Sequence, residues 1–109
     1  MKTKAPILKI NKEQPRPPLT PLLRGIGEPL RWRILAELSA GEPLMVMEIA
    51  ERLRRSADLI SKHLAVLRQS GVVEIGRGRL YQIPPHYLPT PGERVLDFGH
   101  CLLRFDPPE

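Results

Sequence analysis

The sequence has one cysteine, no long apolar run and no apolar core near its N-terminus, and each absence excludes a class of protein. The lone Cys101 cannot form an internal disulfide, which fits a reducing compartment. No apolar run approaches the roughly 18 residues of a transmembrane helix, and a signal-peptide core is missing. A chain of 109 residues is also too short for a large enzyme. We therefore expect a cytoplasmic, single-domain protein with no membrane partner.

Acidic residues are scarce in the part of the chain where basic residues gather. The net charge is +5 and the isoelectric point about 9.9, which favours acidic partners such as nucleic acid or an anionic membrane surface. Residues 52–81 include seven basic and two acidic residues, so this segment alone carries a net charge of +5. The basic residues are Arg52, Arg54, Arg55, Lys62, Arg68, Arg77 and Arg79.

Residues 54–71, RRSADLISKHLAVLRQSG, are predicted to form a helix with marked ends and one apolar stripe. Ser56 can cap the first turn with its hydroxyl, and Gly71 can end the helix in the left-handed conformation. The apolar stripe, spaced at i, i+4 and i+7, consists of Ile60, Leu64 and Leu67. The opposite face carries small and polar residues, namely Asp58, Ser61, Lys62, Ala65 and Gln69. This pattern fits an ordinary solvated face or a face presented to nucleic acid.

Three shorter helices are predicted before this one. Residues 19–26 can form a helical turn or helix, and a second helix starts at Pro29, which suits a first turn, and ends by Gly41. A third helix over residues 46–53 has apolar side chains at i, i+3, i+4 and i+7. Only residues 54–56 separate it from the next helix, which is the spacing of a helix-turn-helix whose second member enters the major groove.

A basic β-hairpin is predicted directly after the last helix. Residues 72–75 and 80–83 are β-prone, and the sequence GRGR between them is typical of a tight turn. A basic hairpin at this place in the chain is a wing. Arg77 and Arg79 at its tip can reach phosphate or the minor groove, although exposed turn arginines also serve solubility.

These stretches resemble the ArsR/SmtB-type winged-helix repressors. The resemblance covers about residues 19–83, through GEPLRWRIL, the GRGRLYQI hairpin and, most specifically, the run ISKHLAVLRQSGVV. It implies a homodimeric transcriptional regulator, usually a repressor, whose operator is a short imperfect palindrome of double-stranded DNA. The alternative is a winged-helix module that binds another protein, because a fold does not fix a function.

The chain departs from the family pattern in the turn before the recognition helix. Proteins of this kind often have glycine there, whereas this chain has Arg54 or Arg55. A non-glycine residue in the left-handed region costs about 1 kcal/mol. We therefore expect a turn that is wider or tightened differently.

The family's metal-sensing cysteine box is replaced by LMVME at residues 44–48. Thioethers cannot supply the thiolates that hold arsenite or zinc. Met45 and Met47 are expected to fill core space rather than to bind Cu(I). We predict no metal and no cofactor, with the effector left open. The remaining candidate is a site shared across a dimer by Asp97, His100 and Cys101.

The two ends of the chain are predicted to lie outside the winged-helix domain, which spans residues 19–84. Residues 1–18 are basic and rich in proline, as in a flexible arm or a plain tail. Residues 85–109 combine a proline-rich linker with an apolar segment. This segment fits either a helix or a strand; the central Gly99 and the aromatic residues favour a strand, and a dimerisation role is expected.

The sequence thus predicts a mainly α fold with a small β-hairpin, an α-rich α+β winged helix-turn-helix, with a possible further strand or helix at the C-terminus. Residues expected to contact DNA bases are Ala57, Asp58, Ser61 and Lys62. Residues expected to contact the DNA backbone or minor groove are Arg54, Arg55, Ser56, His63, Arg68, Arg77, Arg79 and Tyr81. Residues expected in the dimer interface are Leu22, Leu23, Ile26, Leu96, Phe98, Leu102 and Phe105. No catalytic residue is proposed, because adjacent His100 and Cys101 point in different directions in a helix or a strand.

Overall fold

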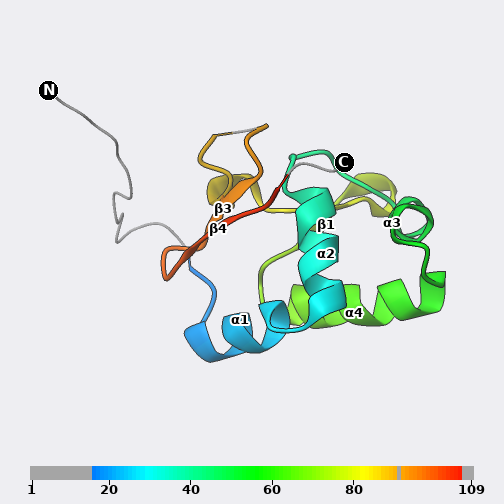
Figure 1. Ribbon diagram of the computed structural model, residues 1–109, viewed down its shortest axis with the longest axis horizontal. Coiled ribbons are helices and arrows are strands. Elements are labelled where there is room, and N and C mark those ends of the chain that lie inside the picture. Colours follow the sequence, from blue (N-terminus) through cyan, green and yellow to red (C-terminus); the bar gives the residue numbers. More distant parts are fainter. Residues whose placement is uncertain (1–15, 91, 107–109) are drawn as a thin grey trace, which may run out of the picture.

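Four helices are followed by two small β-hairpins in the computed structural model, which describes residues 16–90 and 92–106 (Figure 1). The helices are α1 (Leu19–Ile26), α2 (Pro29–Leu38), α3 (Val46–Leu53) and α4 (Ala57–Gln69). The strands are β1 (Glu74–Ile75), β2 (Tyr81–Gln82), β3 (Val95–Asp97) and β4 (Leu102–Arg104), with short 3₁₀ turns η1 (Arg77–Arg79) and η2 (Pro85–Tyr87). The predicted fold class, a winged helix-turn-helix, is confirmed. No helix in these two ranges is long and apolar enough to cross a membrane.

The core forms where α4 passes across one end of α2, with α1 and α3 on opposite sides (Figure 1). The whole predicted stripe of α4, Ile60, Leu64 and Leu67, is fully buried. Ile34 and Leu35 of α2 are fully buried in the same cluster. Full burial of one such side chain stabilises the fold by about 1.5–3 kcal/mol. The apolar periodicity of the sequence therefore fixes which face of α4 is left for solvent.

Hydrogen bonds to side chains define where α2 and α4 begin. The backbone N–H of Leu59 donates to Ser56 Oγ at 3.2 Å, as expected for an N-cap. Glu28 caps α2 just before Pro29: the backbone N–H of Arg31 donates to Glu28 Oε1 at 2.8 Å. This bond lowers the pKa of the Glu28 carboxyl, so the cap is ionised at neutral pH.

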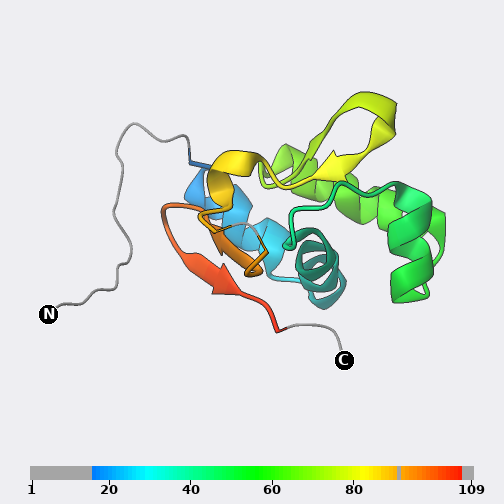
Figure 2. The same ribbon diagram turned by 90° about the horizontal axis from the view of Figure 1, so that it is seen from above.

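The first hairpin, residues 74–82, forms the wing, which projects from the helices in Figure 2. β1 and β2 pair antiparallel and have two residues each, so they are shorter than the predicted runs. Gln82 Nε2 donates to Glu74 Oε2 at 2.6 Å across the pair. The loop before α3 extends the pairing, because Leu44 and Tyr81 exchange backbone hydrogen bonds of 2.9 and 2.7 Å. The wing is thereby tied to the start of the helix-turn-helix.

The C-terminal segment is extended, as favoured from the sequence, and forms a second hairpin rather than one strand. β3 and β4 pair antiparallel, and Gly99, at φ +85°, lies in the turn between them. Arg94 Nη1 donates to the carbonyl of Ala36 at 2.8 Å, which anchors the hairpin near the C-terminal end of α2. The rings of Trp32 on α2 and Phe105 after β4 lie 4.8 Å apart. The hairpin therefore belongs to the same core as the helices.

The last residues of the predicted N-terminal arm pack against this second hairpin. Pro17 is buried, and its carbonyl lies 3.0 Å from His100 Nε2. Because a carbonyl oxygen only accepts, His100 donates from Nε2. A Cβ added at Gly99 would lie 2.7 Å from the Arg16 side chain. Residues 1–15, to which the rest of the arm prediction applies, lie outside the described residues.

Four residues predicted for the dimer interface are instead part of the core of the single chain. They are Leu22, Leu96, Phe98 and Phe105, with exposed fractions of 0, 0, 0 and 4%. The prediction was wrong for these four because the second hairpin folds back onto α1 and α2 and uses them there. Ile26 is partly buried, whereas Leu23 and Leu102 keep exposed fractions of 53% and 39%. Only these last two remain clearly available to a partner.

Arg54, the residue that ends α3, adopts the left-handed conformation usual for glycine. Its φ and ψ are 57° and 49°, and its backbone N–H donates to the carbonyls of the last turn. The sequence had led us to expect a turn that is wider or tightened differently, and the structure shows neither. The turn keeps the left-handed residue, and the arginine bears the strain of about 1 kcal/mol.

Arg54→Gly is therefore expected to raise the free energy of unfolding by up to about 1 kcal/mol, because glycine tolerates positive φ. Arg55→Gly is the matched control, since Arg55 does not have positive φ. There the added freedom of the unfolded chain should destabilise the protein by about 0.4–1 kcal/mol. Urea unfolding of both variants measures the difference. Equal destabilisation by both glycines would contradict the strain at Arg54.

Candidate functional site

The exposed face of α4 carries three of the four residues predicted to contact bases. Asp58, Ser61 and Lys62 are exposed and lie opposite the buried stripe. The fourth, Ala57, is partly buried and packs against the core, so only part of its side chain is left for a base contact. Ala57 lies three residues before Ile60, so it is on the side of α4 that carries the buried stripe.

A groove of about 250 Å³ runs between α4, the start of α3 and the wing. It is lined by Met45, Val46, Met47, Ser61, Gly78, Arg79 and Tyr81. Three of these, Ser61, Arg79 and Tyr81, were predicted DNA contacts from separate stretches of sequence. The fold therefore brings the recognition helix and the wing to one surface.

The two methionines of this groove are exposed rather than buried. Met45 and Met47 have exposed fractions of 45% and 67%, so their prediction as core residues was wrong. The buried residues of α3 are Ile49, Ala50 and Leu53, while Met45 and Met47 line the groove at its start. The exposure of Met47 could have been predicted from the sequence, because Met47 lies off the apolar face of α3 defined by Val46, Ile49 and Leu53.

Basic side chains surround the exposed face of α4. Arg77 and Arg79 are exposed at the tip of the wing, where Gly78 and Arg79 both have positive φ. Arg68 is exposed in the last turn of α4, and Arg54 is exposed in the turn before it. None of these four forms an ion pair among the described residues. Their charges are available to an anionic partner.

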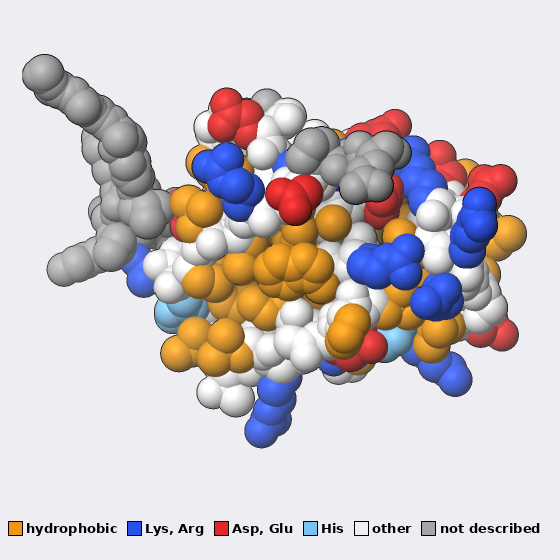
Figure 3. Space-filling view, in the orientation of Figure 1, with side chains coloured by type: hydrophobic (Ala, Val, Ile, Leu, Met, Phe, Trp, Pro, Cys, Tyr) orange, Lys and Arg blue, Asp and Glu red, His pale blue; other side chains and the backbone are white. Residues whose placement is uncertain are grey.

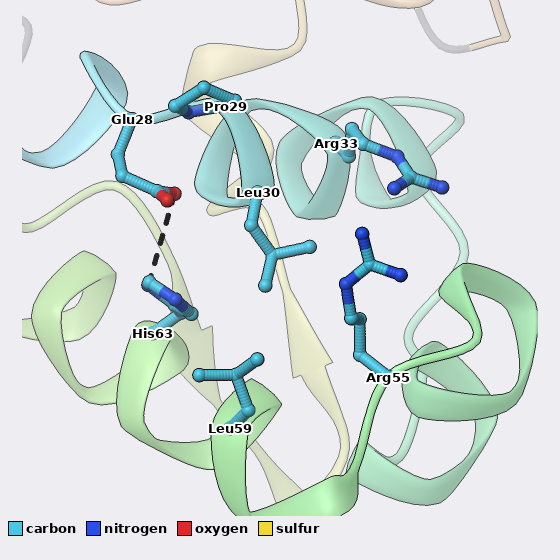
Figure 4. A pocket seen from close by; sticks show the side chains of 7 residues that line it. All are labelled: Glu28, Pro29, Leu30, Arg33, Arg55, Leu59 and His63. Carbon is cyan, nitrogen blue, oxygen red and sulfur yellow. Dashed lines mark ion pairs between the residues drawn. The ribbon is translucent and has the colours of Figure 1, made fainter.

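His63 does not lie on this surface. Its Nδ1 atom is 3.1 Å from Arg31 Nη1, and its side chain is 17% exposed. Because a guanidinium only donates, Nδ1 is the acceptor in this contact. Glu28 Oε1 lies at 4.0 Å, which becomes an ion pair only if the ring is protonated (Figure 4). His63 therefore joins α4 to α2, and its predicted contact with the DNA backbone stays a prediction.

The candidate metal residues are close in sequence but do not form a cluster in the single chain. Within the described ranges, no group of three or more His, Cys, Asp or Glu side chains could hold a metal ion. Burial, and then the nearby Asp97 carboxylate, raise the pKa of the Cys101 thiol. Cys101 is therefore mainly the protonated thiol at neutral pH, not the thiolate that binds soft metals. A site completed by a second copy stays a prediction.

Comparison with known proteins gives a family and a structural relative. Residues 26–75 match the family described as a helix-turn-helix domain. Seven chains of solved structures match this protein, among them HlyU from Vibrio cholerae N16961. That similarity has 31% sequence identity and a TM-score of 0.55, and it covers 60% of this chain and 73% of HlyU. No curated protein matches this chain.

Proposed function

Because the chain belongs to the winged helix-turn-helix family of DNA-binding transcriptional regulators, we propose that it is a homodimeric repressor of the ArsR/SmtB type. The proposed operator is a short imperfect palindrome of double-stranded DNA. The observation that carries the proposal is the single surface formed by the exposed face of α4, the start of α3 and the basic wing. This chain would act by binding rather than by catalysis, and it would do so in the cytoplasm, where bacterial-type repressors meet DNA.

Sequence reading is assigned to the exposed face of α4. Asp58 can accept a hydrogen bond from cytosine, and Lys62 can donate to guanine. Ser61 can serve either purpose. The groove beside Ser61 also offers the exposed Met47 as an apolar contact for a thymine methyl group.

Positioning on the DNA backbone is assigned to residues around this face. Arg77 and Arg79 of the wing reach phosphate or the adjacent minor groove, and Tyr81 lies beside them in the groove. Arg54 and Arg68 contact phosphate at the two ends of α4. Ser56 uses its hydroxyl oxygen to cap α4, which leaves the hydroxyl proton for phosphate.

Dimerisation is assigned to an apolar face formed by α1, α2 and β4. Figure 3 shows hydrophobic side chains gathered in the middle of one side of the molecule. The exposed fractions on these elements are 48% for Leu19, 53% for Leu23, 39% for Trp32 and 39% for Leu102. A C2 dimer through this face would bury these side chains. A palindrome requires two recognition helices, about 34 Å apart on one side of the DNA.

Leu23→Glu is expected to convert the proposed dimer to a monomer without unfolding it, because Leu23 is exposed and a charge buried in an apolar interface is costly. Met47→Glu is the control, since Met47 is exposed on the wing side of the molecule. Light scattering at micromolar concentration measures the mass of each protein. A wild-type protein that is a stable monomer would overturn the dimer and favour the protein-interaction module.

Binding-site selection from genomic DNA with the purified full chain tests the function itself. The proposal expects an enriched palindrome and an affinity that falls with rising salt as counterions are released. A module that binds protein would enrich no sequence. The proposal includes no metal sensing at the family's cysteine box, so zinc and arsenite should leave operator binding unchanged.

A further inference from the structure

An open cleft of about 380 Å³ lies between α2 and the first turns of α4 (Figure 4). It is lined by Glu28, Pro29, Leu30, Arg33, Arg55, Leu59 and His63. Its volume is within the range of small-molecule sites, about 300–1,000 Å³. It is distinct from the groove beside the wing, with which it shares no residue.

Two arginines converge at one end of this cleft. Figure 4 shows the side chain of Arg33, from α2, and that of Arg55, from the turn before α4, extending toward one another. Neither forms an ion pair among the described residues, and the guanidinium of Arg55 donates only to the carbonyl of Arg54, at 3.2 Å. Two facing cations repel one another unless an anion lies between them. Planar guanidinium groups are well suited to hold a carboxylate or a phosphate.

The middle of the cleft is apolar. Leu30 and Leu59 lie between the arginines and the far end in Figure 4. Leu59 lies in the capped first turn of α4, and its side chain is 37% exposed. A phosphate of the DNA backbone would use the arginines and leave this apolar surface in water. A small molecule with both an anionic group and an apolar body would use both.

The far end of the cleft sets a limit on the ligand's charge. Glu28 and His63 lie there, and hydrogen bonding to the Arg31 backbone lowers the pKa of Glu28, so its carboxylate is ionised at neutral pH. His63 Nδ1 lies 3.1 Å from Arg31 Nη1, so this ring nitrogen is already occupied by a donor. A second anionic group at this end would be repelled by Glu28. The cleft therefore favours a monoanion over a dianion.

We propose that the cleft between α2 and α4 binds a small organic monoanion with an apolar body, held by Arg33 and Arg55 and packed on Leu30 and Leu59. The ligand contacts the turn and first residues of the recognition helix, so it acts as an effector of DNA binding. This regulatory consequence rests on the proposed function, whereas binding itself does not. By thermodynamic linkage, the factor by which the ligand changes the affinity for the operator equals the factor by which the operator changes the affinity for the ligand.

The test uses 2-naphthoate as the probe, titrated by calorimetry into the full chain without DNA. The expected result is saturable binding, with at least about tenfold weaker binding of neutral 2-naphthamide and of 2,6-naphthalenedicarboxylate. Arg33→Gln should weaken naphthoate binding by about tenfold or more. Arg24→Gln, an exposed arginine on α1, is the matched control and should change nothing.

Three results would overturn the proposal. They are no binding of naphthoate, equal binding of naphthoate and naphthamide, and full retention of binding in Arg33→Gln. A parallel titration with DNA tests whether the anion bound by the arginines is instead a phosphate of the DNA backbone. If Arg33→Gln lowers the salt slope of DNA binding by about one unit while naphthoate does not bind, the cleft holds a DNA phosphate instead. Because the probe titration needs no DNA, its failure is separate from failure of the proposed function.

Discussion

Phe98→Ala is expected to lower the free energy of unfolding by about 3–5 kcal/mol, the usual cost of removing a large buried aromatic side chain. Phe98 is fully buried, and its ring meets the ring of Tyr87 edge-on at 5.0 Å. A small domain has only about 5–15 kcal/mol of stability. Its melting temperature should therefore fall by more than about 10 °C. Thermal unfolding followed by circular dichroism measures this.

Arg104→Ala is the matched control for Phe98→Ala because Arg104 belongs to the same hairpin and is exposed. We expect it to change stability by less than about 0.5 kcal/mol. The pair separates a core role from an interface role. If the Phe98→Ala protein keeps its melting temperature but becomes monomeric, Phe98 acts in the dimer interface and not in the core.

The helices could be predicted from the sequence because the information that defines them is local. Ser56 and Gly71 lie at the two ends of α4, and the stripe from Ile60 to Leu67 lies within it. Each of these features acts over a few residues. The same holds for the wing, where glycines at 76 and 78 mark the turn between two β-prone runs.

The role of the C-terminal segment could not be predicted, because it depends on contacts between distant parts of the chain. Leu96 and Phe98 are apolar in either a core or an interface, and their own spacing does not distinguish the two. Arg94 makes the difference, since it bonds to Ala36, 58 residues earlier, and brings the hairpin onto α2. No pattern within the segment carries that information.

The candidate site was predictable to the extent that it follows from helix geometry. Asp58, Ser61 and Lys62 are exposed because they lie opposite a stripe that is buried. His63 lies at the edge of that stripe, where a shift of a few tens of degrees decides between solvent and a neighbour. The neighbour is Arg31 on α2, whose position the sequence of α4 does not reveal.

Replacing the wing arginines and replacing Lys62 are expected to affect DNA binding in different ways. Arg77→Ala with Arg79→Ala should weaken binding to all sequences alike, because phosphate contacts carry no sequence information. The slope of log affinity against log salt should fall by about 0.9 for each phosphate that the variant no longer neutralises. Lys62→Ala should instead cost about 1–3 kcal/mol on the selected operator and little on unrelated DNA. Fluorescence anisotropy over a range of salt concentrations measures both.

Arg104→Ala is the control for the wing variants, since Arg104 is an exposed arginine of β4, the red strand that lies away from the wing in Figure 2. It removes one positive charge, as each wing substitution does, and should leave the salt slope unchanged. If Arg104→Ala lowers affinity as much as a wing substitution does, the effect comes from net charge and not from direct binding by the wing. If the double wing variant binds DNA as tightly as the wild type, the wing has no role in DNA binding, and α4 with its flanking arginines must carry the whole interface.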